Sequence, residues 1–174
     1  MFFIPGELIA ILTFPGIIIH EMGHKLFCTL AGIPVYKTCY FRIGNPAGYV
    51  IHEPVQSYEK DFLICVAPII VNTAIAIFIF AIALNTHSLA VVISLYWLGI
   101  SIGMNAFPSS GDADNIWQHS KEDWRHNTVA ILGFPIVILI KIANVLSIIW
   151  FDLLYAIALL LIVGVSPVIL QWLA

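Results

Sequence analysis

Two histidines four residues apart interrupt a long apolar segment near the start of the chain. The segment runs from Ile9 to Leu30 and contains the motif HEMGH, with His20 and His24 at its ends and Glu21 between them. Side chains four positions apart lie on one face of a helix, so both imidazoles can bind one zinc ion, with Glu21 close enough to act on water there. Ionisable groups at membrane depth are costly and usually functional. The segment therefore predicts a hydrolytic metal site within a bilayer.

Composition supports a membrane location. The 174 residues are 61% hydrophobic and only 10% charged, with a mean hydropathy of +1.00. A soluble domain carries about 25% charged residues, so this chain cannot cover a water-facing surface of normal size. The length suits a single domain, here residues 1–174. The net charge of −3 without a basic run argues against nucleic acid as a partner, and three cysteines without paired spacing argue against a disulfide framework.

The apolar runs predict an all-α polytopic membrane protein with about five spans, each needing about 20 residues. The first three predicted spans are Glu7 to Gly32, Leu63 to Leu84, and Leu89 to about Phe107. Residues 128–172 are nearly all apolar. One helix of that length would reach about 65 Å, roughly twice a bilayer core. We therefore expect a helical hairpin there, with its turn between Asn144 and Asp152.

Two local signals shape the region around the first span. Pro15-Gly16 is expected to kink this span just ahead of the histidines. The segment from Val35 to Asp61 is richer in charge, and two β-prone runs flank the turn residues 44–48. This pattern predicts a small β-hairpin between the first and second spans, at the membrane surface or partly dipping into the membrane.

Basic residues set the expected orientation. The loops after the first and third spans share one side. This side carries Lys25, near the end of the first span, and every other lysine and arginine except Lys141, which is expected at the outer interface. The positive-inside rule places these loops in the cytoplasm and the N-terminus outside. We expect an integral protein of a prokaryotic plasma membrane, with the histidine pair in the cytoplasmic half of the first span.

A catalytic zinc usually has three protein ligands, so two histidines leave the site incomplete. Asp112 and Asp114 follow the third span on the side where His24 is expected. Asp112 is the preferred ligand, because it is placed to cap the next helix with its carboxylate in a fixed direction; Asp114 is the alternative. Cys28, one turn after His24, is a weaker candidate. The remaining histidines of these loops, His52, His119 and His126, are expected to be solvated.

Taken together, three motifs resemble the site-2 protease family of membrane zinc metalloproteases. They are the HEMGH motif, the run APIIVN ending at Asn72, and Asn105-x-x-Pro108 followed by aspartate. The resemblance covers about residues 8–118 and implies a three-helix catalytic core. It implies zinc ligation by His20 and His24, and a catalytic base at Glu21.

The resemblance also assigns a third ligand and a polar support. It implies that an aspartate after the third span completes the zinc site and that Asn72 supports substrate or an oxyanion. Here the family's usual Leu-Asp-Gly reads Gly-Asp-Ala-Asp, so Asp112 and Asp114 bracket the expected position. The expected cofactor is one Zn²⁺ per chain.

The resulting hypothesis is an intramembrane zinc endopeptidase whose partners are the lipid bilayer and a membrane protein or peptide substrate. Two alternatives stay open: a catalytically silent membrane zinc protein, and a metalloprotease for peptides outside the membrane. A metal transporter is a weaker rival, since it needs polar residues along a path across the membrane and the outer halves of the spans are nearly all apolar.

Overall fold

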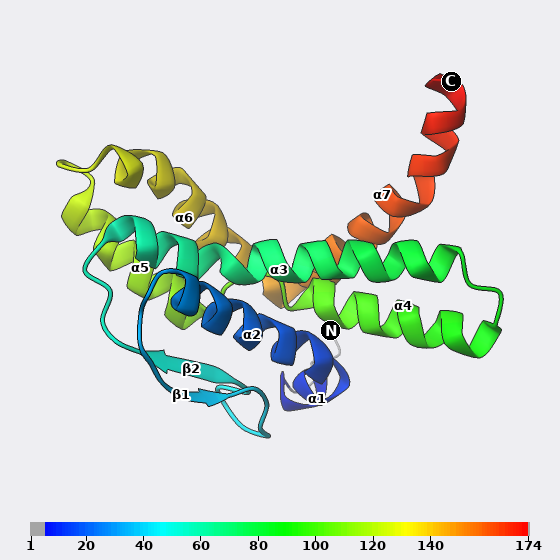
Figure 1. Ribbon diagram of the computed structural model, residues 1–174, viewed down its shortest axis with the longest axis horizontal. Helices are drawn as coiled ribbons and strands as arrows, with labels where there is room; N and C mark the ends of the chain where they lie inside the picture. The colour runs from blue at the N-terminus through cyan, green and yellow to red at the C-terminus, as the bar shows by residue number, and fades with distance from the viewer. Residues whose placement is uncertain (1–5, 174) are drawn as a thin grey trace.

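The computed structural model describes the backbone of residues 6–173 and the side chains of residues 6–165. This part of the chain is mostly helical, with a two-stranded antiparallel sheet near its start (Figure 1). The elements are α1 (Gly6–Leu12), α2 (Phe14–Leu30), β1 (Val35–Cys39), β2 (Tyr49–His52), α3 (Tyr58–Leu84), α4 (Leu89–Met104), α5 (Ser110–Asp123), α6 (Thr128–Leu146), a short 3-10 helix (Ser147–Ile149) and α7 (Phe151–Leu173).

The first apolar segment is bent sharply. Helices α1 and α2 meet at Thr13 with an angle of 83° between them. Pro15 lies in the first turn of α2, where a missing N–H costs nothing, but its ring would collide with a preceding turn of α1 if the helix continued. The predicted kink is therefore confirmed, slightly before the proline, and it leaves the histidines on the straight helix α2.

The predicted hairpin is present. Strands β1 and β2 pair antiparallel, with Thr38 opposite Val50 and Cys39 opposite Tyr49. Residues 40–48 connect the two strands, and we call them the hairpin loop. This loop includes the predicted turn residues 44–48. Gly44 has a φ of 140°, a conformation that side chains with a Cβ rarely adopt. The hairpin lies below α2 in Figure 1, and both of its strands contact the helix that carries both histidines.

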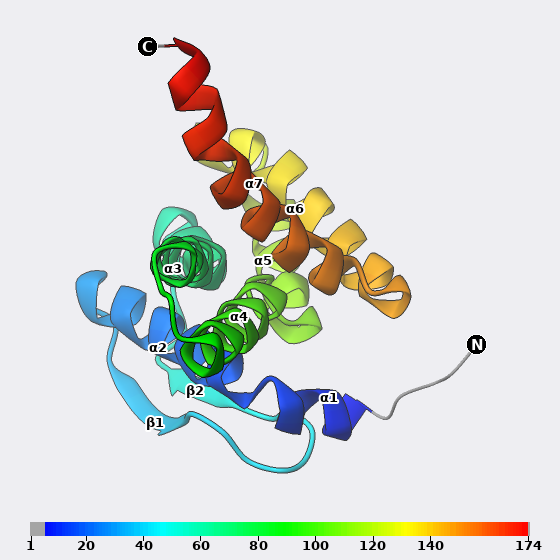
Figure 2. The ribbon, with the colours of Figure 1, turned by 90° about the vertical axis from the view of Figure 1, so that its right-hand side faces the viewer.

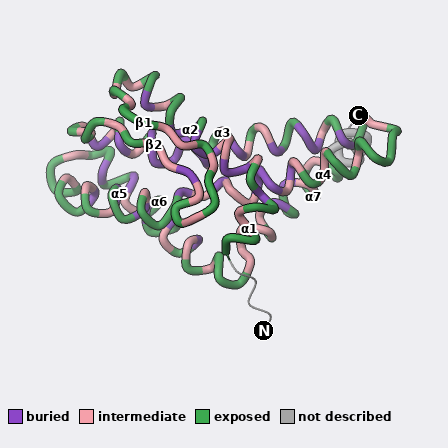
Figure 3. Tube along the Cα trace, turned by 90° about the horizontal axis from the view of Figure 1, so that it is seen from below, coloured by how far each residue is buried: buried purple, intermediate pink, exposed green. Residues whose placement is uncertain are grey.

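Helix α3 is the centre of the fold, and different helices pack on its two halves. Its first half packs against α5 and α6 through a cluster of Tyr58, Cys65, Ile116, Ala130 and Val137. Its second half packs against α4 and α7 through a cluster of Ala76, Ile79, Phe80, Ile102 and Leu159. Figure 3 marks buried residues where α2, α3 and α4 meet. The first of these helices carries the histidines and the other two surround them.

The last apolar stretch is divided as predicted, within residues 144–152. The break consists of the 3-10 helix and Trp150, whose φ of 65° turns the chain before α7. Helix α6 packs chiefly on α5, whereas α7 packs on α4 and α3, so α6 and α7 form an open V (Figure 1). The point of this V lies near the end of α4, where Phe107 contacts Phe151.

The length and composition of the described helices support two or three of the five predicted membrane spans. Among the described residues, α3 and the stretch Thr128–Ile149 are long and apolar enough to cross a membrane, and the bent pair α1–α2 is a third if it forms one span. Helix α4 and the part Phe151–Val165 of α7 are apolar but shorter. The prediction of five spans is therefore not confirmed.

Candidate metal and catalytic site

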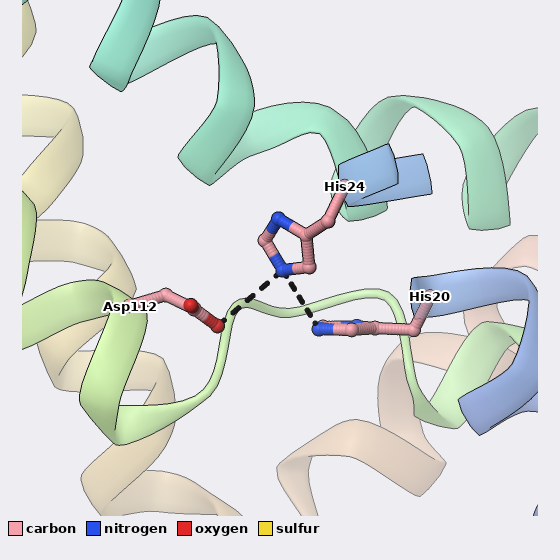
Figure 4. A group of neighbouring side chains, drawn as sticks. All are labelled: His20, His24 and Asp112. Atoms are coloured by element: carbon pink, nitrogen blue, oxygen red, sulfur yellow. Dashed lines mark hydrogen bonds and ion pairs between the residues drawn. The ribbon is translucent and has the colours of Figure 1, made fainter. Parts of the chain in front are cut away.

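His20, His24 and Asp112 converge although the aspartate is far from the histidines in sequence (Figure 4). The Nε2 atoms of the two histidines are 3.2 Å apart, and His24 Nε2 is 3.4 Å from Asp112 Oδ2. Tetrahedral zinc with bonds of 2.0–2.1 Å separates its donor atoms by about 3.3 Å. The donor set and its spacing therefore fit a zinc ion. Cys28 is buried but is not part of this group.

Backbone carbonyls fix both imidazole rings. His20 Nδ1 lies 2.8 Å from the Asn105 carbonyl oxygen, and His24 Nδ1 lies 3.0 Å from that of Ile64. A carbonyl oxygen only accepts, so each Nδ1 is the donor. In the neutral rings, this leaves the lone pairs on the two Nε2 atoms, which face each other. Such carbonyl partners orient metal-binding histidines, and a cation between the rings removes the repulsion of the lone pairs.

Asp112 is held by the start of α5. Ser109, not Asp112, is the N-cap, because the helix begins at Ser110; Asp112 is the third helical residue of a capping box. Its Oδ2 accepts hydrogen bonds from the backbone N–H (3.0 Å) and the hydroxyl (2.6 Å) of Ser109. The carboxylate of Asp112 is therefore fixed in direction as expected, but from the third helical position of the capping box and not from the N-cap position.

Electrostatics keep Asp112 in the form that binds metal. Burial alone would raise the pKa of this carboxyl. The hydrogen bond and charge of His24, when its ring is protonated on Nε2 as well, and the hydrogen bond of Ser109 hold the pKa well below the usual range. A metal ligand must be deprotonated, so Asp112 is available as a donor at neutral pH.

Asp114 lies elsewhere on α5. Its carboxylate forms an ion pair with Lys141 of α6, and its side chain is 67% exposed. It is not among the described groups that could hold a metal. The ion pair also places Lys141 beside the polar segment after α4. The reason is that α6 folds back along α5, which the linear order of spans does not reveal.

Glu21 lies beside the histidines on α2 and under the hairpin loop. Its side chain is 7% exposed and has no hydrogen bond or ion pair among the described residues. A Cβ on Gly48 would lie 2.7 Å from Glu21 Cγ, so a glycine at this position lets the loop approach the carboxylate. A buried carboxylate without a partner is a typical general base.

Two cavities meet at Glu21. The larger, about 550 Å³, is lined by His24, Asp112 and Tyr49. The smaller, about 380 Å³, is lined by His20 and reaches the corner between α6 and α7. Glu21 lines both cavities, and so does part of the hairpin loop. Between them, the two cavities are lined by all three candidate ligands.

Asn72 is placed behind the site. Its side chain is fully buried, and its Nδ2 lies 2.9–3.1 Å from the carbonyl oxygens of Gly16, Ile102 and Asn105. It thereby ties α3 to α2 and α4, and it shares the Asn105 carbonyl with His20. Asn72 lines neither of the two cavities that contain Glu21. This position suits holding His20 in place better than touching a substrate.

A set of polar contacts between α3 and α5 was not predicted from the sequence. His119, expected to be solvated, lies in α5 with its side chain 16% exposed and its Nδ1 2.8 Å from Oδ2 of buried Asp61. Asn115 approaches the other oxygen of Asp61 at 3.4 Å. The available signal was the spacing of Asn115, His119 and Asp123, which places them on one face of a helix. We call Asp61, Asn115 and His119 the α3–α5 clamp.

Loss of the clamp should weaken metal binding at a distance. His119→Ala leaves buried Asp61 with a poorer set of partners and loosens α5, which carries Asp112. We expect zinc affinity to fall by about 10-fold, the lower end of the range for groups that hydrogen-bond a metal ligand directly, because the partners of His119 are Asp61 and Asp123 and not a ligand. His119→Gln can still donate a hydrogen bond to Asp61, so its zinc affinity should lie between those of His119→Ala and the unsubstituted protein. The measurement is zinc competition against a fluorescent chelator in detergent.

The matched control for the clamp is Lys141→Met. It removes the exposed ion pair with Asp114 on the same helix, and exposed pairs contribute only about 0–1 kcal/mol. Its zinc affinity should therefore stay within about threefold of the unsubstituted protein. An equal loss of zinc affinity in the Lys141 and His119 variants would show that removing any ionic contact of α5 weakens zinc binding. It would exclude a specific role for the clamp.

Searches against protein-family models, curated proteins and solved structures found no match to this chain.

Proposed function

We propose that this protein is an intramembrane zinc endopeptidase that hydrolyses peptide bonds in or next to membrane-spanning segments. The observation that carries the proposal is the convergence of His20, His24 and Asp112 beside an unpaired Glu21, on an apolar helix and facing a cavity. Three nitrogen and oxygen donors with a nearby carboxylate are the usual components of a catalytic zinc site. The resemblance to site-2 proteases supports the same assignment.

The residues have distinct roles in the proposed reaction. His20, His24 and Asp112 would hold the metal. Zinc, when bound, would supply a Lewis acid that polarises the scissile carbonyl and lowers the pKa of water. Glu21 takes the proton from the attacking water and delivers it to the leaving amine nitrogen. The carbonyls of Asn105 and Ile64 keep both imidazoles oriented while this happens.

Substrate would pass beneath the hairpin loop. A helical span hides its carbonyl groups in hydrogen bonds, so the bond to be cleaved must first become extended. Tyr49 and Val50 of β2 line the larger cavity, and a two-stranded sheet leaves each strand one edge without a partner strand. An extended substrate segment can add to such an edge.

The proposed topology keeps five spans and a cytoplasmic active site. Helix α4 would then cross a bilayer that is locally thin, since a shorter helix can be accommodated in this way. All lysines and arginines except Lys141 lie on the side of the loops after the first and third spans. The positive-inside rule then places that side in the cytoplasm.

The test is cleavage in proteoliposomes containing purified protein, zinc and a pool of single-span substrates, with products located by mass spectrometry. We expect zinc-dependent cuts within or next to the spans. Cuts confined to soluble peptides in a mixed pool would favour the alternative of a protease for non-membrane peptides. A protein that binds zinc but cuts neither pool would support the catalytically silent alternative.

A further inference from the structure

Another polar cavity lies beside the larger cavity of the candidate site. It has a volume of about 470 Å³, and we call it the side cavity. The end of β2, the link to α3, the first turn of α3 and one face of α5 line it. His52, Asp61 and Asn115 line both the side cavity and the larger cavity, which is also lined by His24 and Asp112. The two cavities therefore meet at these three shared residues.

The ionisable side chains of the side cavity become less exposed toward the candidate ligands. Glu122 is exposed, His52 and His119 are half-buried, and Asp61 is 5% exposed. Asn115, His119 and Glu122 are four and three residues apart on α5, so they share one face of this helix. The series leads from water at Glu122 to the boundary with the larger cavity.

The charge of the lining favours a cation. Asp61 and Glu122 are the acids of the side cavity, and no lysine or arginine of residues 6–165 lines this cavity or the larger one. In the proposed topology, the same side of the membrane carries every lysine and arginine except Lys141. A cleft lined by charges of one sign concentrates ions of the opposite sign and speeds their entry. The side cavity is therefore an acidic cleft on an otherwise basic side.

His52 presents a metal-binding atom where the two cavities meet. Its Nδ1 lies 2.8 Å from the carbonyl oxygen of Glu53, which can only accept, so Nδ1 is the donor. In the neutral ring this leaves a lone pair on Nε2, which has no hydrogen bond or ion pair among the described residues. His20 and His24 are oriented by backbone carbonyls in the same way. A ring held like this is a typical zinc donor.

A zinc ion needs such donors on its way to the candidate ligands, because these are buried. His20 and His24 are only 8% and 6% exposed. Removing water from a cation is costly unless protein groups replace the water molecules step by step. The side cavity offers carboxylate and imidazole groups from its exposed end to the larger cavity. It can therefore conduct a cation to the buried site.

We propose that the side cavity is the entrance for zinc, and that His52 transfers the ion from this cavity to the candidate ligands in the larger one. Glu122 attracts the hydrated cation at the exposed end. His52 then holds the ion through Nε2 at the boundary between the cavities, and Asp112 and His24 receive it. This inference rests on the zinc site of the proposed function but does not require proteolysis.

The test is the exchange of bound zinc for isotopically labelled Zn²⁺ in the zinc-loaded protein in detergent, with the zinc affinity measured at equilibrium. His52→Ala and Glu122→Gln should each slow exchange by about tenfold, the lower end of the range by which a charged cleft speeds the entry of an ion. The ion crosses the same barrier on entry and on release, so both rates should fall by the same factor and the affinity should stay unchanged. His52→Glu, which restores a metal donor, should recover the exchange rate.

Controls match each substitution. His126→Ala removes an exposed histidine, and Glu53→Gln removes an exposed acid beside His52. Neither residue lines the side cavity or the larger cavity, so exchange should keep its rate in both variants. Asp152→Asn changes an acid of the smaller cavity, which His20 also lines. Figure 2 shows α3 and α4 between the hairpin, which carries His52, and helices α6 and α7, the second of which carries Asp152.

The measurements separate the entrance from a structural role and from the proposed function. Faster release with weaker affinity in His52→Ala would indicate a loosened site and overturn the entrance. Unchanged exchange in His52→Ala and Glu122→Gln, or slower exchange in Asp152→Asn alone, would also overturn it and leave the proposed function standing. Exchange that depends on His52 in a protein that cleaves no peptide would retain the entrance and overturn the proposed function. A protein that binds no zinc would overturn both.

Discussion

Glu21→Gln should abolish proteolysis and leave zinc bound. Glutamine has nearly the shape of glutamate but cannot accept the proton from water, and loss of a general base typically costs about 10²–10⁴-fold in rate. The Glu21 side chain has no hydrogen bond or ion pair among the described residues, so the substitution breaks no such contact. Rates in proteoliposomes and zinc content by mass spectrometry would be measured on the same samples.

The control for this result is Glu7→Gln. Glu7 is an exposed acid in the first turn of α1, so the same chemical change there should leave cleavage near the unsubstituted rate. Full activity of the Glu21→Gln protein would contradict the proposed mechanism. It is the result expected if the zinc has a structural or substrate-holding role instead.

Asp112→Asn should remove zinc, whereas Asp114→Asn should not. The Asp112 carboxylate lies 3.4 Å from His24 Nε2, within the group that could hold a metal. Substituting groups that only orient ligands costs about 10- to 100-fold in metal affinity, so removal of a ligand charge should cost at least about 100-fold. Asp114 loses only an exposed ion pair with Lys141. Zinc stoichiometry and affinity would be measured for both variants.

A second control separates ligation from the helix cap, because Asp112 takes part in both. Ser109→Ala removes the N-cap but keeps the carboxylate; it should destabilise the protein by about 1 kcal/mol. It should retain more zinc than Asp112→Asn. If Asp114→Asn lost zinc and Asp112→Asn kept it, the assignment of the third ligand would be wrong.

Several elements were predictable because their signals are local. Pro15 predicts the bend in the first segment, since a proline ring excludes the preceding helical turn whatever surrounds it. Turn residues 44–48 predict the hairpin for the same reason. The number of spans was less predictable. Hydropathy does not tell where apolar helices end, and α4 is shorter than a bilayer core requires.

The sequence by itself determined that His20 and His24 face the same way, with Glu21 beside them, because helical periodicity fixes the relation of residues four apart. Only the tertiary structure decided between Asp112 and Asp114. Two residues apart on a helix, they point in different directions, and the packing of α5 between α3 and α6 turns one toward His24 and the other toward Lys141. The clamp at His119 depends on the same packing of distant segments. No local pattern determines such contacts, because they join residues that only the arrangement of helices around α3 brings together.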